Sequence, residues 1–135
     1  MLKNNFKFPS LFTCNVSVIG LGYVGLPIAI ELDKTKKCYL TGKPLSRNIV
    51  GFDINKERID QLNANIDLTN EISVNDLKKI RNLSFSYSTD SVLDSDVFIV
   101  TVPTPINQNN DPDLTPIIKA SEFIGKTLFL RLKKK

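Results

Sequence analysis

Apolar residues follow two alternating patterns along this chain. Short apolar runs occupy residues 15–19, 49–52 and 97–102, and residues 83–86 alternate between apolar and polar side chains. Continuous runs of this length are typical of strands that are buried on both faces of a parallel sheet. Between them, apolar residues recur at helical spacing over residues 23–32, 55–65, 73–80 and 115–128. The order predicts an α/β fold with a right-handed, mostly parallel sheet.

Local signals predict the ends of several elements. Ser73 is expected to cap the helix that follows it, and Thr89 or Asp90 is expected to cap a brief helical turn. In the final helix, Thr115 is the predicted cap and Pro116 takes the first helical position. The buried stripe of that helix is predicted to consist of Ile117, Ala120, Ile124 and Leu128.

Three segments fall outside this pattern. Residues 1–14 are expected to form a lead-in and residues 129–135 a basic tail, which leaves one domain over residues 15–128. Within it, residues 33–48 are predicted to form an exposed inserted loop, because Gly42 and Pro44 break regular structure and several cations surround them. Loops lengthen at a cost of about 0.6 kcal/mol per doubling, so the insertion is compatible with the fold.

The composition narrows the classes of function. The net charge of +4 comes from four cations after residue 130, since the other 14 basic residues are balanced by 14 acidic ones. A basic tail on a neutral domain is not a nucleic-acid-binding face. No apolar run approaches the ~18 residues of a membrane span, and no secretory signal follows Met1. We therefore expect a cytoplasmic protein with neither a nucleic acid nor a membrane as its partner.

The chain also lacks common catalytic side chains. It contains no histidine, which removes the most frequent general base and metal ligand. Cys14 and Cys38 form neither a C-x-x-C motif nor a disulfide framework, so we expect two reduced thiols and no metal site.

The spacing of three glycines gives the most specific chemical signal. Gly20, Gly22 and Gly25 follow the first apolar run in the order G-x-G-x-x-G, and a helical pattern comes next. In a dinucleotide site the first glycine permits a tight turn, the second admits the pyrophosphate, and the third packs the helix against the strand. The second apolar run ends in Asp53, where such sites place an acid that bonds ribose hydroxyls. The alternative at this point is a glycine turn with no ligand.

Four segments together resemble the amino-terminal domain of the UDP-glucose/GDP-mannose dehydrogenase family. They are Ser-Val-Ile-Gly-Leu-Gly-Tyr-Val-Gly-Leu-Pro (17–27), Gly-Phe-Asp-Ile-Asn-Lys-Glu-Arg-Ile (51–59), Phe-Ile-Val-Thr-Val-Pro-Thr-Pro-Ile (98–106) and Pro-Asp-Leu-Thr-Pro (112–116). The nearest likeness is to the branch that acts on UDP-N-acetylhexosamines, of the Vi-polysaccharide type. The resemblance covers about residues 15–128. It implies NAD as the cofactor and an α/β, Rossmann-like, doubly wound fold with a mostly parallel sheet, whose second half is incomplete.

The resemblance also implies roles for single residues. Asp53 would bond the adenosine ribose, Arg58 would reach the same ribose or the adenine, and Thr89 would be a hydroxyl on the cofactor side. The pyrophosphate of NAD would lie on the backbone of Gly20, Leu21, Gly22, Tyr23, Val24 and Gly25.

The last motif carries the implied catalytic position. Val102 and Pro103 would approach the nicotinamide, and Thr104 would help to position water or substrate. For some of these residues a purely structural role is the alternative: a helix cap for Asp53 and Thr89, a solvated helix face for Arg58, and a turn for Thr104.

The resemblance covers only part of the family's machinery. Members continue into a second domain that carries the nucleophilic cysteine and the sugar-nucleotide pocket. The resemblance therefore implies a truncated NAD-binding domain that is inactive alone. The substrate of the full-length parent would be a UDP-sugar. A homo-oligomer or a complementing carboxyl-terminal fragment would be its protein partner. The alternatives are a non-catalytic dinucleotide-binding or interaction module and a relative of the hydroxyacid or 6-phosphogluconate dehydrogenases.

Overall fold

Four short strands lie side by side in the order β3-β2-β1-β4, and every pair is parallel. The computed structural model describes residues 8–133. In the register, Val18 of β1 is opposite Gly51 of β2 on one side and Ile99 of β4 on the other. The strands are β1 (Val16–Ile19), β2 (Ile49–Phe52), β3 (Leu83–Ser86) and β4 (Val97–Val100). The predicted α/β class and parallel sheet are confirmed.

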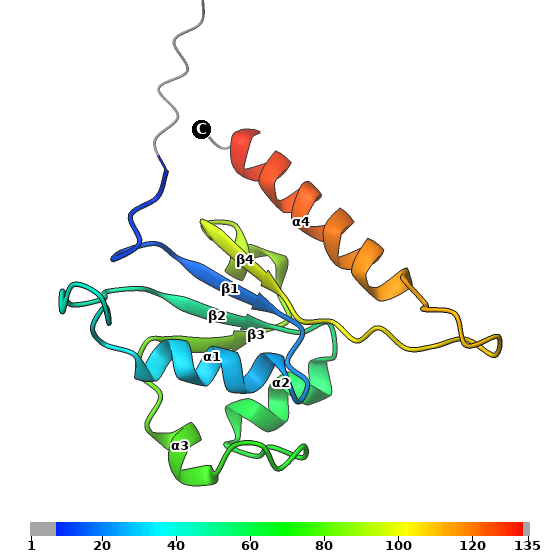
Figure 1. Ribbon diagram of the computed structural model, residues 1–135, viewed down its shortest axis with the longest axis horizontal. Coiled ribbons are helices and arrows are strands. Elements are labelled where there is room, and N and C mark those ends of the chain that lie inside the picture. Colours follow the sequence, from blue (N-terminus) through cyan, green and yellow to red (C-terminus); the bar gives the residue numbers. More distant parts are fainter. Residues whose placement is uncertain (1–7, 134–135) are drawn as a thin grey trace, which may run out of the picture.

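Helices cover both faces of this sheet (Figure 1). The helical elements are α1 (Gly25–Lys34), α2 (Lys56–Asn63), α3 (Val74–Lys78), a 3-10 turn η1 (Thr89–Val92) and α4 (Thr115–Lys133). One core cluster joins Val18 and Ile49 to buried residues of α1, α2 and α3. A second cluster on the opposite face joins Phe52 to α4, where the Phe52 and Phe123 rings stack with centroids 4.6 Å apart.

Both ends of the first helix lie two residues farther along the chain than predicted. It begins at Gly25 rather than Tyr23 and ends at Lys34 rather than near residue 32. Its extension has a physical reason in Asp33, which is buried and accepts the backbone N–H of Asn82 at 2.7 Å. Asp33 therefore belongs to the fold, and the inserted loop begins after Lys34 rather than at residue 33.

The predicted buried stripe of α4 is wrong in part. Ala120 is buried and Ile124 packs against the core, but the side chains of Ile117 and Leu128 are 40% and 43% exposed. Thr127 is fully buried instead, and its hydroxyl donates to the Phe123 carbonyl at 2.9 Å. Because that internal hydrogen bond satisfies the hydroxyl, a polar residue can occupy the core-facing position that an apolar count passes over.

The predicted basic tail continues α4 instead of leaving the domain at residue 129. Arg131 donates to the Ser95 carbonyl at 2.7 Å and to the Asp96 carboxylate at 3.1 Å, so it ties the last turn of the helix to the start of β4. Residues 134–135 of that tail, like residues 1–7 of the lead-in, lie outside the described residues. Within residues 8–133, no helix has the length and apolar content that crossing a bilayer requires.

Three predicted caps can be compared with the structure. Ser73 caps α3 as predicted, since its hydroxyl accepts the Asp76 N–H. The expected cap by Thr89 or Asp90 is wrong, because η1 is preceded by Ser88 and has no capping side chain. At α4 the helix already includes Thr115, whose N–H donates to the Asp113 carboxylate at 2.9 Å. The Thr115 side chain, as a hydrogen-bond donor, is the main cause of a lowered Asp113 pKa, and this backbone bond is the second.

Candidate cofactor site

The glycine loop joins the carboxyl end of β1 to α1 and is closely packed at two of its glycines. Gly20 has a φ of +97°, and a Cβ on it would lie 3.0 Å from the Thr101 carbonyl oxygen. A Cβ on Gly25 would lie 1.9 Å from the Gly20 carbonyl oxygen and 2.4 Å from Thr101 Oγ1. Both positions therefore exclude any side chain: the first for the turn, the second for the approach of α1 to the loop.

The middle glycine of the loop faces open space. No heavy atom lies within 4 Å of the Cβ position of Gly22. Tyr23 and Val24 beside it are 71% and 47% exposed, whereas Leu21 is fully buried. Neither turn geometry nor packing at this position requires a glycine, which is what a backbone designed to approach a phosphate closely would show.

The backbone that leads into α1 has N–H groups without hydrogen-bond partners among the described residues. Val24 occupies the N-cap without a side-chain hydrogen bond, and the first turn holds no acidic residue. Backbone N–H groups in the first turn of a helix lack helical partners, and the helix dipole makes this end attractive to anions. Leu26 and Ile28 already donate to the Gly22 and Val24 carbonyls, and Pro27 has no N–H. Among the described residues, the donors left without a hydrogen bond are therefore the N–H groups of the loop itself, from Gly22 to Gly25.

Asp53 lies directly after β2 and contacts the glycine loop. Its Oδ2 accepts the Leu21 N–H at 2.8 Å, and its Oδ1 accepts the Asn55 N–H at 2.9 Å. Asn55, not Asp53, caps α2 through the N–H of Arg58. A carboxylate offers about four acceptor positions, so this half-buried group retains capacity for ribose hydroxyls.

Arg58 braces the same loop from α2. Its Nε donates to the Leu21 carbonyl at 2.9 Å, and its side chain is 11% exposed. One guanidinium nitrogen also lies 2.9 Å from the fully buried Asp67 carboxylate. The solvated helix face considered for Arg58 is therefore not what the structure shows.

The carboxylate of Asp67 is held by a dense set of donors. Burial raises its pKa, but hydrogen bonds from the Thr69 hydroxyl, the Ile72 N–H and Arg58 outweigh that effect and lower it from 3.8 to about 2. The charged pair thus fixes the segment between α2 and α3 against the glycine loop.

Thr101 is a residue of this site that sequence reasoning missed. Its hydroxyl donates to the Gly20 carbonyl at 2.7 Å and lies 3.1 Å from the Ile19 carbonyl. It stands inside the Thr-Val-Pro-Thr-Pro motif, but a hydroxyl at a strand end carries no sequence signal of its partner. Asp67 was also missed, although an Asp two residues before a Thr is a recognisable turn pattern.

The remaining predicted positions lie farther along the chain. Val102 follows Thr101 and packs against the core cluster of Phe52, while Pro103 and Thr104 are exposed beyond it. Thr89 is exposed at the start of η1, after β3. Among the described residues, no side-chain hydrogen bond joins Thr89 or Thr104 to the glycine loop, and no cluster of three metal-ligating side chains forms.

Comparison with known proteins bears on what this site binds. Residues 14–131 match the NAD binding domain of the UDP-glucose/GDP-mannose dehydrogenase family. The chain belongs to this family. The matched region is the NAD-binding domain of this family, and that role accounts for both the open Gly22 and the acid after β2. The family model points to NAD as the cofactor.

Individual members of the family give the same picture. The UDP-N-acetyl-D-glucosamine 6-dehydrogenase of Pseudomonas aeruginosa is 49% identical over 113 residues, which are 84% of this chain and 24% of that protein. The enzyme of the same name from Salmonella typhi is 43% identical over the same shares of the two chains. The chain thus spans about a quarter of the length of these relatives.

A solved structure agrees in fold. The ternary complex of GDP-mannose dehydrogenase from Pseudomonas aeruginosa superposes with a TM-score of 0.68 at 30% identity. The match covers 82% of this chain and 24% of that one. The Rossmann-like class therefore rests on both the sheet order and the dehydrogenase neighbours.

Proposed function

We propose that this chain binds NAD through the glycine loop and Asp53, as the cofactor half of a nucleotide-sugar 6-dehydrogenase. The observation that carries the proposal is the contrast among three glycines. Gly20 and Gly25 are closed by neighbouring atoms, whereas Gly22 opens to space beside loop N–H groups that form no hydrogen bond among the described residues. A purely structural turn would need the first and third glycine but not the second.

Each predicted residue takes a role in this proposal. The backbone from Gly20 to Gly25 would hold the pyrophosphate, and Asp53 would accept the ribose hydroxyls. Arg58 is here a positioning residue, because its Nε is already engaged by the Leu21 carbonyl. Val102 and Pro103 would border the nicotinamide. Bound NAD would supply the hydride acceptor for oxidation of an alcohol.

The substrate proposal comes from the relatives. Two of them are named UDP-N-acetyl-D-glucosamine 6-dehydrogenase, which favours a UDP-N-acetylhexosamine whose C6 alcohol is oxidised to a carboxylate in polysaccharide biosynthesis. Thr104, beyond β4, would position water or substrate in that reaction. A cytoplasmic location stays a prediction.

We further propose that the chain is inactive alone. Cys14 is buried before β1, and Cys38 lies in the segment after α1, so neither thiol lies at the carboxyl ends of the strands. The described residues therefore bring no thiol nucleophile to the glycine loop. This observation also favours the second candidate, a dinucleotide-binding module that works with a separately supplied partner.

Cofactor choice tests the role of Asp53. An ionised Asp53 would repel the 2′-phosphate of NADP, so calorimetric titration should show NAD bound at least about tenfold more tightly than NADP. Lys56 is already paired with Asp60, which leaves the acid dominant. Asp53→Ala should shrink the preference, while Glu122→Ala, on the exposed face of α4, should preserve it. Equal or tighter NADP binding by the unmutated chain would contradict the assignment.

A further inference from the structure

The segment between α1 and β2 forms a small ordered hairpin, residues 36–45. Lys37 and Pro44 form an antiparallel bridge. Cys38 N donates to the Lys43 carbonyl at 2.8 Å, and Leu45 N donates to the Lys36 carbonyl at 2.8 Å. The turn closes with a 2.8 Å bond from Gly42 N to the Cys38 carbonyl, and Gly42 has a φ of +66°. The predicted loop is therefore exposed but not irregular.

The tip of this hairpin holds two apolar side chains out of the protein. Tyr39 is 99% exposed and Leu40 is 88% exposed. Neighbouring apolar residues with so little contact usually mark a surface that is covered by a partner. The cross-strand hydrogen bonds hold this tip in place, so its exposure does not follow from a lack of structure.

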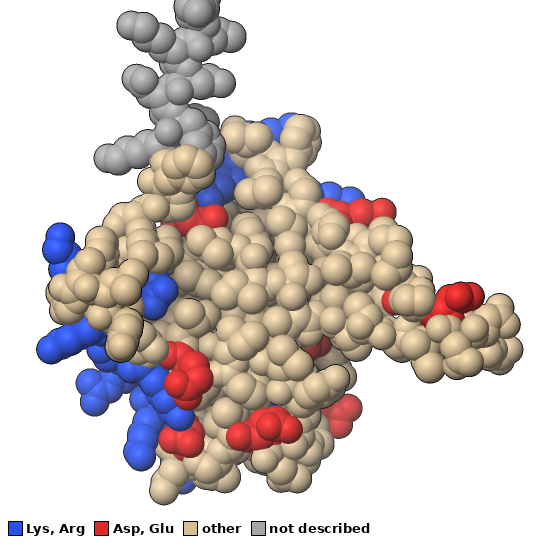
Figure 2. All heavy atoms as spheres, viewed as in Figure 1, with Lys and Arg blue, Asp and Glu red and all other residues tan. Residues whose placement is uncertain are grey.

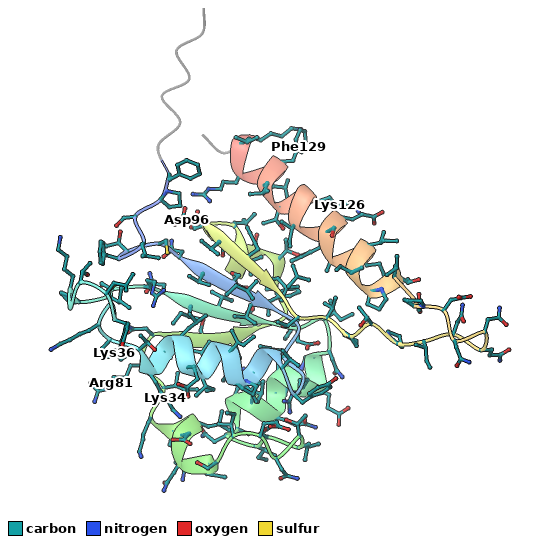
Figure 3. The ribbon with its side chains drawn as sticks, viewed as in Figure 1. Lys34, Lys36, Arg81, Asp96, Lys126 and Phe129 are labelled. Carbon is teal, nitrogen blue, oxygen red and sulfur yellow. The ribbon has the colours of Figure 1, made fainter. Side chains whose placement is uncertain are left out.

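Cations surround the apolar tip. Residues 35–48 contain Lys36, Lys37, Lys43 and Arg47 and no acidic residue. Lys36 lies 3.7 Å from the carboxylate of Asp33, at the base of the hairpin, and the other lysines of the segment have no ion pair among the described residues. Figure 2 shows the basic side chains gathered on this flank of the molecule, and Figure 3 labels Lys34, Lys36 and Arg81 there.

The hairpin lies at the end of the sheet opposite the cofactor site. The strands' carboxyl ends and the glycine loop point one way, and the hairpin enters β2 from the other (Figure 1). A flat surface that contacts the hairpin would therefore leave the glycine loop facing away from it.

We propose that this hairpin docks the chain onto an anionic lipid bilayer, with Tyr39 and Leu40 inserted among the headgroups. Tyrosine favours the membrane interface, leucine favours the acyl boundary, and lysines beside them are attracted to anionic lipid. This contact differs from the expectation that no membrane is a partner, which considered only spanning and secretory segments. Residues 8–133 hold no helix that could cross a bilayer, but a peripheral contact needs none. Nucleic acid fits less well, because it offers no apolar phase for an aliphatic Leu40 at the tip.

The absence of tryptophan from the chain gives a direct test. In Tyr39→Trp the new residue is the only tryptophan, and its emission should shift to the blue on addition of vesicles of phosphatidylcholine with about 30 mol% phosphatidylserine. Tyr87→Trp, placed after β3, is the matched control and should not shift. No shift for Tyr39→Trp, or the same shift for both variants, would overturn the proposal.

Vesicle sedimentation measures separately how much the apolar tip and the surrounding lysines contribute to binding. Tyr39→Ser with Leu40→Ser should weaken binding to the anionic vesicles about tenfold or more, because the apolar contribution is lost. Lys37→Gln with Lys43→Gln should do the same, whereas Lys119→Gln with Lys126→Gln on α4 should not. Within residues 8–133, these side chains form no hydrogen bond or ion pair, and only Lys43 contacts an aromatic ring, that of Phe12. Unchanged melting curves would check the fold of each variant.

Two results would overturn the proposal in favour of another partner. Equal vesicle binding by the unmutated chain and by the Tyr39→Ser, Leu40→Ser variant would exclude insertion of the tip. The binding would then be a non-specific attraction of the basic side chains to anionic lipid. Binding to a polyuridylate with no binding to anionic vesicles would make the flank a nucleic-acid surface. Raised salt should weaken the binding of the chain to the vesicles. The Tyr39→Trp molecules that remain bound should keep their blue-shifted emission.

Discussion

The hydroxyl of Thr101 donates to the carbonyl of Gly20 at 2.7 Å, across residues that are far apart in the sequence. It thereby fixes the tight turn after β1 to the end of β4. The same threonine leaves only 2.4 Å to a Cβ on Gly25, so one side chain sets both the turn and the start of α1. The glycine loop is in this way joined to the residue that directly precedes Val102 and Pro103.

Thr101→Val should therefore lower stability by about 1–2 kcal/mol, since it leaves a partly buried carbonyl without its donor. NAD binding should weaken as well, because the turn loses its tie to β4. Thr101→Ser keeps the hydroxyl and should recover most of both. Thermal unfolding and NAD titration of the two variants check this, and equal behaviour of valine and serine would contradict it.

Three glycine-to-alanine variants should separate packing from cofactor approach. Gly25→Ala should destabilise the fold by about 1–3 kcal/mol, because its Cβ would lie 1.9 Å from the Gly20 carbonyl oxygen. Gly22→Ala meets no atom within 4 Å and should melt like the unmutated chain. Gly125→Ala, open within α4, should stabilise by about 0.5–1 kcal/mol. A large loss of stability in Gly22→Ala would contradict this assignment.

Acid should weaken the fold through Asp67. Its folded pKa of about 2 lies below the unfolded value, so its contribution is full above the unfolded pKa and is lost as the pH falls through about 2. The loss should amount to about 2 kcal/mol. Urea unfolding between about pH 5 and about pH 2 measures it. Asp67→Asn should flatten this dependence, whereas Asp60→Asn, on the exposed face of α2, should leave it intact.

The edge strand β4 should promote self-association. Within the described residues it pairs with β1 alone, and Val97 and Val100 are 38% and 36% exposed. An unpaired strand edge is a template for further pairing. Sedimentation velocity should show concentration-dependent oligomers, and Val100→Lys should reduce them. A single monomeric species at all concentrations would contradict this, and would also count against the homo-oligomer that the family resemblance implies.

The sequence predicted those parts of the fold that local patterns determine. The parallel strands, the glycine turn and Ser73 followed from apolar runs and residue chemistry near each position. What it did not predict depends on contacts between distant residues. Asp33 seemed to begin a loop because its partner, the Asn82 N–H, lies 49 residues away.

The same reason explains why a solvated helix face was an alternative for Arg58. Neither the Leu21 carbonyl nor Asp67 can be paired with Arg58 from sequence. Thr127 reads as polar and therefore external, yet its bond to the Phe123 carbonyl permits burial. Tertiary hydrogen bonds thus determine the position of Arg58, whereas a hydrogen bond within α4 permits the burial of Thr127.

The most direct test of the central claim is calorimetric titration of the full chain with NAD, beside the Gly22→Ala variant. A methyl group at residue 22 has room in the fold but would occupy the path of the pyrophosphate. The account predicts saturable binding to one site on the unmutated chain and at least about tenfold weaker binding to Gly22→Ala with an unchanged melting temperature. Absence of binding by the unmutated chain, or equal affinity of the two proteins, would contradict it.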